Sequence, residues 1–252
     1  MEQREFEQRL SQIATVWTVL LQGNKGSGDA DGLVQAAVLE RYQPAVYRYL
    51  LGAVRDPDAA DELFQEFALR FVRGDFRQAD PERGRFRDYV KTALINLVIN
   101  YHKKVSRRSA ATLEKPEALA TTAGRVDLGQ QFLSNWRKAI LDLAWEGLAA
   151  REKLGGPPFF TILRLRTEQP QLSASEAAKQ LTAQLRPAEP FTDSGVRKIL
   201  QRARELFADL LVDEVARSLK TSSLDRLEQE VSDLGLQVYC QRALQRRRDS
   251  SS

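Results

Sequence analysis

Apolar side chains recur every three or four positions along most of the chain, which is the pattern of amphipathic helices. The first apolar stripe lies at 4–21 and the second at 33–54. Pro57 precedes a third stripe at 58–73, and a fourth occupies 85–108. No run alternates apolar and polar residues as a half-buried strand does. The pattern therefore predicts an all-α protein.

The second half of the chain continues the same pattern. Helical patterning over 129–153 is followed by two short helices at 159–167 and 174–185. A long helix is expected over 194–218 and a single last amphipathic helix over 222–247. The sequence contains no internal repeat.

One stretch departs from this helical pattern and separates two candidate domains. Residues 109–128 are rich in Ala and Thr and contain Pro116 and Gly124, which indicates an interdomain linker. The expected organisation is an N-terminal helical extension (1–32), a first helical domain (33–108), the linker (109–128), a second helical domain (129–219) and a C-terminal helical extension (220–252).

The composition narrows the class of protein. The chain has 252 residues, of which 42% are hydrophobic and 29% charged, as in soluble globular proteins. No apolar run approaches the roughly 18–20 residues of a membrane span, and the charged start MEQREFEQRL is unlike a signal peptide. Cys240 is the single cysteine, so no intramolecular disulfide forms and a cytoplasmic location is expected. His102 is also alone, and we expect no metal and no cofactor.

The net charge of +4 is modest, but it is distributed unevenly along the chain. Residues 85–108 hold seven Lys and Arg against one Asp, and residues 55–66 hold five acidic residues against Arg55. An acidic and a basic block side by side indicate two partners, one basic and one polyanionic, or salt bridging between neighbouring helices. Charge alone leaves both interpretations open.

On a helix, the basic segment 85–108 separates into two faces at about 100° per residue. The apolar face, expected to pack on a core, is Val90, Leu94, Leu97, Val98, Tyr101 and Val105. The opposite face, which we call the basic stripe, falls within an arc of about 80°. It consists of Arg85, Tyr89, Thr92, Asn96, Asn100, Lys103 and Arg107. Cations neutralise phosphates, Asn bonds base edges and Tyr stacks on exposed bases, so this stripe favours nucleic-acid binding over a merely solvated face.

A second DNA-binding candidate spans residues 173–204. Here a short helix with Ala178 and Leu181 facing inward is followed by a turn and a longer helix. Thr192, Asp193 and Ser194 supply capping chemistry at the start of the longer helix. The first half of that helix is basic, as expected for a recognition helix in a helix-turn-helix. Its cations are Arg197, Lys198, Arg202 and Arg204.

Four segments, in order, resemble the bacterial sigma factors of the extracytoplasmic-function type. RYQPAVYRYLL (41–51) is similar to the opening helix of sigma region 2, and ADELFQEF (60–67) to the family's acidic stretch. GRFRDYVKTALINLVINYHKKVSRR (84–108) is similar to the helices that read and melt the −10 element. SGVRKILQRARELFADLL (194–211) resembles the second helix of the region 4 helix-turn-helix.

This resemblance implies three binding surfaces and no catalytic residue. The acidic surface, expected to dock the β′ subunit of core RNA polymerase, is Asp61, Glu62, Gln65 and Glu66. The basic stripe would hold the melted −10 strand. The −35 duplex would be read by Thr192, Ser194, Arg197, Lys198, Gln201 and Arg202. The implied partners are core polymerase (β′ and β), promoter DNA and an anti-sigma factor, with no membrane.

The turn at 186–193 departs from the family because it is longer than usual and contains Pro187 and Pro190. Three rival functions remain for comparison. A helix-turn-helix regulator acting without polymerase would use 173–204 but leave ADELFQEF without a role. A helical adaptor would show no salt-dependent DNA affinity. An enzyme is disfavoured, because GNKGSGDADG (23–32) lacks the spacing of a phosphate-binding loop.

Overall fold

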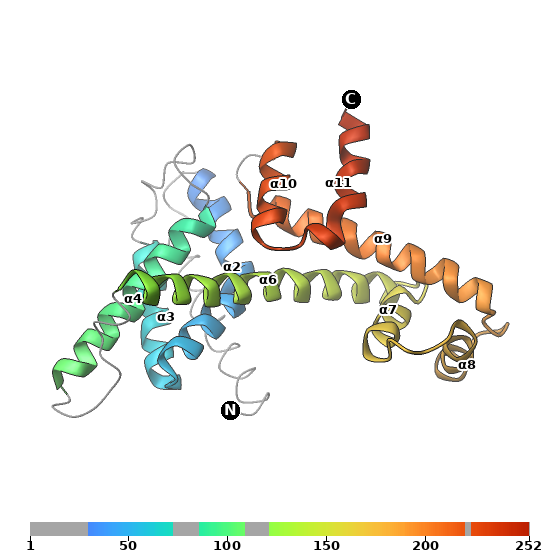
Figure 1. The fold of residues 1–252 in the computed structure, drawn as a ribbon, viewed down its shortest axis with the longest axis horizontal. Coiled ribbons are helices and arrows are strands. Elements are labelled where there is room, and N and C mark those ends of the chain that lie inside the picture. The colour runs from blue at the N-terminus through green and yellow to red at the C-terminus, as the bar shows by residue number, and fades with distance from the viewer. Residues whose placement is uncertain (1–29, 73–85, 109–120, 220–222, 252) are drawn as a thin grey trace. The chain divides into compact units, whose positions relative to one another are not determined.

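In the computed structural model, the described residues are 30–72, 86–108, 121–219 and 223–251, and every regular element in these ranges is an α-helix (Figure 1). The prediction of an all-α protein is therefore confirmed for this part of the chain. The predicted helix at 4–21, Arg85 of the basic stripe and the first twelve residues of the predicted linker lie outside the described residues.

Contacts divide the described chain into two units, which separate within one helix between Ala139 and Ile140. Unit 1 contains α2 (Ala30–Val54), α3 (Pro57–Val72), α4 (Phe86–Arg108) and the first part of α6 (Thr122–Lys153). Each unit has its own apolar core.

The core of unit 1 is built from aromatic side chains of α2, α3 and α6. Tyr42 stacks on Trp136 with ring centroids 4.3 Å apart, and Tyr49 meets the edge of Phe132 at 5.6 Å. On the α3 side, Phe64 packs edge-on against Tyr47. These rings are all buried, and paired aromatic rings in such arrangements stabilise a fold beyond the area they bury.

A sharp corner joins α2 to α3 and sets the direction of the acidic helix. Arg55 adopts a positive φ of 56° just after α2 ends. Asp56 Oδ1 then accepts hydrogen bonds from the backbone N–H of Asp58 (3.0 Å) and Ala59 (3.3 Å). Pro57, which lacks an N–H, takes the first helical position, where no donor is needed.

Helix α6 begins earlier than the sequence pattern predicted. Residues 122–128 belong to α6 rather than to a linker, and Leu128 is buried in unit 1 together with Phe132 and Trp136. The start is capped by Thr121, whose Oγ1 accepts the N–H of Gly124 at 3.2 Å. The predicted domain boundary at 128/129 therefore differs from the boundary that the contacts give, between Ala139 and Ile140. Phe132 and Trp136, just after the predicted boundary, pack on α2 and so belong to unit 1.

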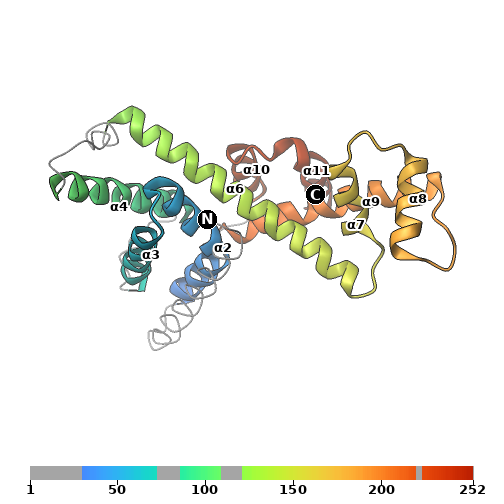
Figure 2. The same cartoon turned by 90° about the horizontal axis from the view of Figure 1, so that it is seen from below.

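Unit 2 is organised around α9 (Asp193–Arg217), which packs against α7 (Phe159–Glu168), α8 (Ala174–Leu185), α10 (Leu224–Asp233) and α11 (Gln237–Ser251). Figures 1 and 2 show α8 lying across the N-terminal end of α9. The second part of α6 joins this core through Trp145, whose ring lies 4.8 Å from that of Phe207 and 5.8 Å from that of Phe160.

The C-terminal extension forms two helices where the sequence predicted one. Gly235 has a φ of 66°, and this left-handed residue breaks the helix between α10 and α11. Val231, Leu236 and Cys240 are buried beside the turn. Val238 follows Leu234 at helical spacing in the sequence, yet it is 87% exposed because the break rotates α11 relative to α10.

Candidate nucleic-acid interface

The acidic surface lies on the side of α3 that faces away from the core of unit 1. Leu63, Phe64 and Phe67 on the opposite side are buried. Glu62, Gln65 and Glu66 are exposed and Asp61 is half-buried, so the helix brings the four predicted residues to one side. Glu66 forms an exposed ion pair with Arg70 at 2.5 Å, which leaves Glu62 as the more available charge for an outside partner.

Helix α4 presents the two faces that the sequence predicted. Val90, Leu94, Leu97 and Val98 are buried, whereas Tyr101 and Val105 are half-buried near the end of the helix. On the basic stripe, Thr92, Asn100, Lys103 and Arg107 are exposed, and Tyr89 and Asn96 are half-buried. Arg85 lies outside the described residues.

The positive charge of α4 is concentrated at its C-terminal end. Asp88 is the one acidic residue of the helix, and it pairs with Lys91 at 3.2 Å and lies 3.9 Å from Arg87. Within the described residues, no carboxylate forms an ion pair with Lys103, Lys104 or Arg107. A helix C-terminus stabilises such cations through its dipole, but it leaves their full charge facing solvent. The end of α4 can therefore attract a polyanion.

Four of these side chains surround a shallow cavity of about 570 Å³ on the surface of α4. It is lined by Asn100, Lys103, Lys104 and Arg107. Lys104 was missed by the sequence analysis because it falls outside the arc of about 80° that defined the basic stripe. Three ammonium or guanidinium groups around one amide can hold a phosphate and an adjacent base edge together.

Arg125 is a second residue that the sequence analysis missed. Its Nη2 donates to Asn96 Oδ1 at 3.2 Å, so the first turn of α6 contributes a cation to the middle of the basic stripe. No local signal pointed to Arg125, because it lies in the segment predicted to be a linker. Thr92 is also engaged: its hydroxyl donates to the carbonyl of Asp88 at 2.9 Å.

The acidic surface and the basic helix meet around Tyr101. Burial, followed by the charges of Asp56 and Glu62, raises the pKa of the Tyr101 hydroxyl above its ordinary value. Next to it, His102 Nε2 lies 3.2 Å from the carbonyl oxygen of Ala53, so this nitrogen donates a hydrogen bond to α2. His102 therefore tethers α4 to the end of α2, a structural role.

In unit 2, the helix-turn-helix candidate is formed by α8 and α9. Ser173 and Glu176 make a reciprocal capping box at the start of α8. The long turn is fixed by Thr182, whose Oγ1 accepts the N–H of Phe191 at 2.9 Å. The two helices pack together with this turn between them, and Ala177, Ala178 and Leu181 face inward.

The predicted −35 residues lie just before α9 or in its exposed first half, and three of them have hydrogen-bond partners. The hydroxyls of Thr192 and Ser194 are hydrogen-bonded to each other at 3.3 Å. Thr192 Oγ1 accepts the N–H of Gly195 at 3.1 Å and so caps α9. Gln201 donates to Glu205 at 3.1 Å. Ser194, Arg197, Lys198 and Arg202 are exposed.

No metal or thiol chemistry is assembled in the part of the chain that the structure describes. Among those residues, no three His, Cys, Asp or Glu side chains lie so that they could hold a metal ion. Cys240 is buried, and burial raises the pKa of its thiol to about 12. None of the described helices combines the length and apolarity needed to span a membrane.

Residues 38–108 match the family model of Sigma-70 region 2. No curated protein and no solved structure matches the chain. The matched residues include most of α2 together with all of α3 and α4, and so contain both the acidic surface and the basic stripe. This Sigma-70 region 2 segment supports a sigma-factor role, in RNA polymerase binding and promoter recognition.

Proposed function

We propose that the protein is a sigma factor of the extracytoplasmic-function type, which binds core RNA polymerase and directs promoter recognition and −10 melting. The observation that carries this proposal is the pairing, within residues 38–108, of an exposed acidic face on α3 with an exposed basic face on α4. Two opposite charges on adjacent helices suit a factor that joins a basic protein surface to a nucleic acid.

In this function, α3 docks on the β′ subunit through Asp61, Glu62, Gln65 and Glu66. Electrostatic attraction between exposed charges speeds association and selects a basic partner. The packed aromatic core behind α3 holds these side chains on a rigid helix, so little conformational freedom is lost on docking.

Helix α4 then holds the melted non-template strand. Lys103 and Arg107 neutralise phosphates, while Asn96, Asn100 and Tyr89 supply amide and aromatic groups for unpaired bases. Strand separation is favoured because exposed bases and phosphates exchange their lost pairing for these contacts. The factor itself makes and breaks no bond, and polymerase supplies the chemistry.

The second unit contacts the −35 duplex through the first half of α9. Arg197, Lys198 and Arg202 are exposed cations within three turns of the capped N-terminus, as a recognition helix requires. We include the β subunit and an anti-sigma factor among the proposed partners, and the cytoplasm as the location, where core polymerase and DNA are found.

The α8–α9 pair supports one alternative, a DNA-binding regulator that acts without polymerase. The two functions are separated by mixing the full chain with purified core polymerase and following their co-elution by size-exclusion chromatography. A sigma factor co-elutes with core in the absence of DNA. A protein that binds duplex DNA but never co-elutes with core is the regulator instead.

A further inference from the structure

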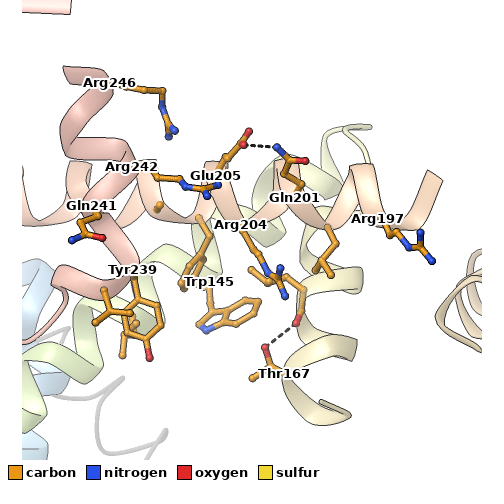
Figure 3. Close-up of a pocket in the computed structure, with 16 residues that line it drawn as sticks. Trp145, Thr167, Arg197, Gln201, Arg204, Glu205, Tyr239, Gln241, Arg242 and Arg246 are labelled. Carbon is orange, nitrogen blue, oxygen red and sulfur yellow. Dashed lines mark hydrogen bonds between the residues drawn. The ribbon is translucent and has the colours of Figure 1, made fainter. Parts of the chain in front are cut away.

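A groove in unit 2 has an apolar floor that the proposed DNA contacts do not use, although Arg197 and Gln201 belong to both surfaces. It has a volume of about 780 Å³ and lies between the second part of α6, α7, α9 and α11 (Figure 3). Its floor is apolar, with Trp145, Leu163 and Phe207 half-buried or buried. One wall comes from α11, the C-terminal helix outside the segment that matches Sigma-70 region 2.

The rim of this groove carries an excess of positive charge. Arg197, Arg204, Arg242 and Arg246 line it, against Glu205 as the one acidic lining residue. The Glu205 carboxylate accepts a hydrogen bond from Gln201 (Figure 3). The groove therefore favours an anionic occupant.

The arginines of unit 2 fall into two groups by their partners. The last three on α11 are held within the unit: Arg246 pairs with Asp209 at 2.7 Å, Arg247 with Asp213 and Arg248 with Glu228 at 2.6 Å. Within the described residues, no carboxylate forms an ion pair with Arg197, Arg204 or Arg242. These three guanidinium groups line the groove and remain available to another molecule, whereas the fourth lining arginine, Arg246, is already paired.

The groove also has apolar side chains at its mouth. Val238 and Tyr239, in the first turn of α11, are 87% and 60% exposed. Both line the groove, and in Figure 3 Tyr239 lies on the same side of α9 as Trp145. Exposed apolar groups beside an apolar floor indicate that the occupant brings apolar side chains of its own.

The extent of the groove suits a short helix. Along α9 its lining runs from Arg197 to Ala208, which corresponds to about 16 Å at 1.5 Å per residue, or three helical turns. A DNA backbone would leave the apolar floor unused, since phosphates are contacted by cations and polar groups. A helix with apolar residues on one face and carboxylates beside them would use both the floor and the rim.

We propose that this groove is a docking site for an acidic amphipathic helix of a partner protein, with Arg204 and Arg242 receiving its carboxylates. This inference does not rest on the proposed sigma-factor function, because it concerns residues of unit 2 that are outside the matched segment. The C-terminal helix α11 then has a binding role in addition to covering α9.

A defined peptide tests the proposal. The probe is a fluorescein-labelled 18-residue helix with Leu at i, i+3, i+4 and i+7 and Glu at the remaining positions, added to the full chain. Fluorescence anisotropy should show saturable binding. A peptide with Lys in place of Glu should bind at least tenfold more weakly, because the rim is cationic.

Substitutions in the groove test where the acidic peptide binds. Arg204→Glu with Arg242→Glu should weaken binding of the acidic peptide at least tenfold, and Tyr239→Ala should weaken it as well. Arg151→Glu makes the same charge change at an exposed position of α6 outside the groove and should change binding less than twofold. Circular dichroism melting checks that each variant folds.

Three results would overturn the proposal. One is the absence of saturable binding of the acidic peptide to the folded wild-type chain. Another is equal binding of the Lys peptide. The third is a double variant that keeps its affinity for the peptide but loses affinity for duplex DNA, which would make the groove a nucleic-acid site.

Discussion

Thr192 is predicted from the sequence to contact DNA, and in the structure it caps α9. Its Oγ1 already accepts the N–H of Gly195. Thr192→Ala should lower the free energy of unfolding by about 1 kcal/mol, the usual cost of losing a capping oxygen. Thr192→Asp keeps a capping acceptor but adds a negative charge.

The two roles of Thr192 can therefore be separated. We expect Thr192→Asp to keep the melting temperature of the wild type while weakening duplex binding severalfold in a gel-shift titration. An unchanged DNA affinity in this variant would remove Thr192 from the DNA-binding surface and leave it as a cap alone.

The polar residues of the basic stripe are expected to hold the melted DNA strand and not to contribute to binding of core polymerase. Substitution of Asn96, Asn100 and Lys103 by Ala should impair open-complex formation at least tenfold, because the melted strand loses amide and phosphate contacts. Binding to core polymerase should be unchanged. Permanganate footprinting measures the melting, and Lys153→Ala, an exposed cation in unit 2, is the matched control.

A different outcome would reverse the assignment of the two surfaces. If these alanine variants melted DNA normally but bound core polymerase weakly, α4 rather than α3 would be the docking helix.

At the scale of elements, α3 is expected to carry the interaction with core polymerase. Reversing two of its exposed charges, with Glu62→Lys and Glu66→Lys, should weaken core binding at least tenfold by placing cations against a basic partner. Glu146→Lys, an exposed acidic residue on α6, should have little effect. The affinity is measured by anisotropy of a labelled protein at fixed ionic strength, because such interactions weaken with salt.

The buried thiol of Cys240 can report whether α11 stays packed on α9. Cys240 is buried, and with a pKa raised to about 12, about one thiol in ten thousand is ionised at pH 8. We expect it to resist a thiol reagent in the folded protein and to react at once in denaturant. Rapid labelling of the native protein at pH 8 would instead mean that α11 detaches readily from α9.

The burial of the Cys240 thiol also determines how the stability of the fold depends on pH. Folding favours the neutral thiol, so its contribution to stability is complete below the pKa of the unfolded chain, near 9. That contribution is lost progressively as the pH rises toward the folded value.

The elements also show which parts of the fold the sequence can predict. Helix α4 was predicted within one residue of its bounds, because its apolar and polar positions separate cleanly. The early start of α6 was missed because Ala, Thr and Gly carry no apolar stripe there. The helix exists because Thr121 caps it and Leu128 and Phe132 pack on unit 1.

The break between α10 and α11 was missed for the opposite reason. Apolar residues continue at helical spacing across Gly235, so periodicity predicted one helix. A single glycine at a positive φ ended it. Whether the helix breaks here depends on how Val231 and Leu236 pack in the core, and the local sequence pattern does not contain that information.

For the whole molecule, the charge of a binding partner can be predicted from the sequence more readily than the residues that contact that partner. The acidic and basic blocks were visible in the charge distribution, and the match of residues 38–108 to Sigma-70 region 2 covers both. Arg125 and the groove beside α11 were not visible, because each depends on segments brought together by folding.

The proposed function is that the protein directs core polymerase to promoters. The most direct measurement is run-off transcription from a library of genomic DNA fragments, by core polymerase with and without the protein. We expect discrete, protein-dependent transcripts that start at defined sites and disappear with the Asn96, Asn100 and Lys103 alanine variants. Transcripts identical to those of core polymerase alone, together with no binding of the protein to core, would contradict it.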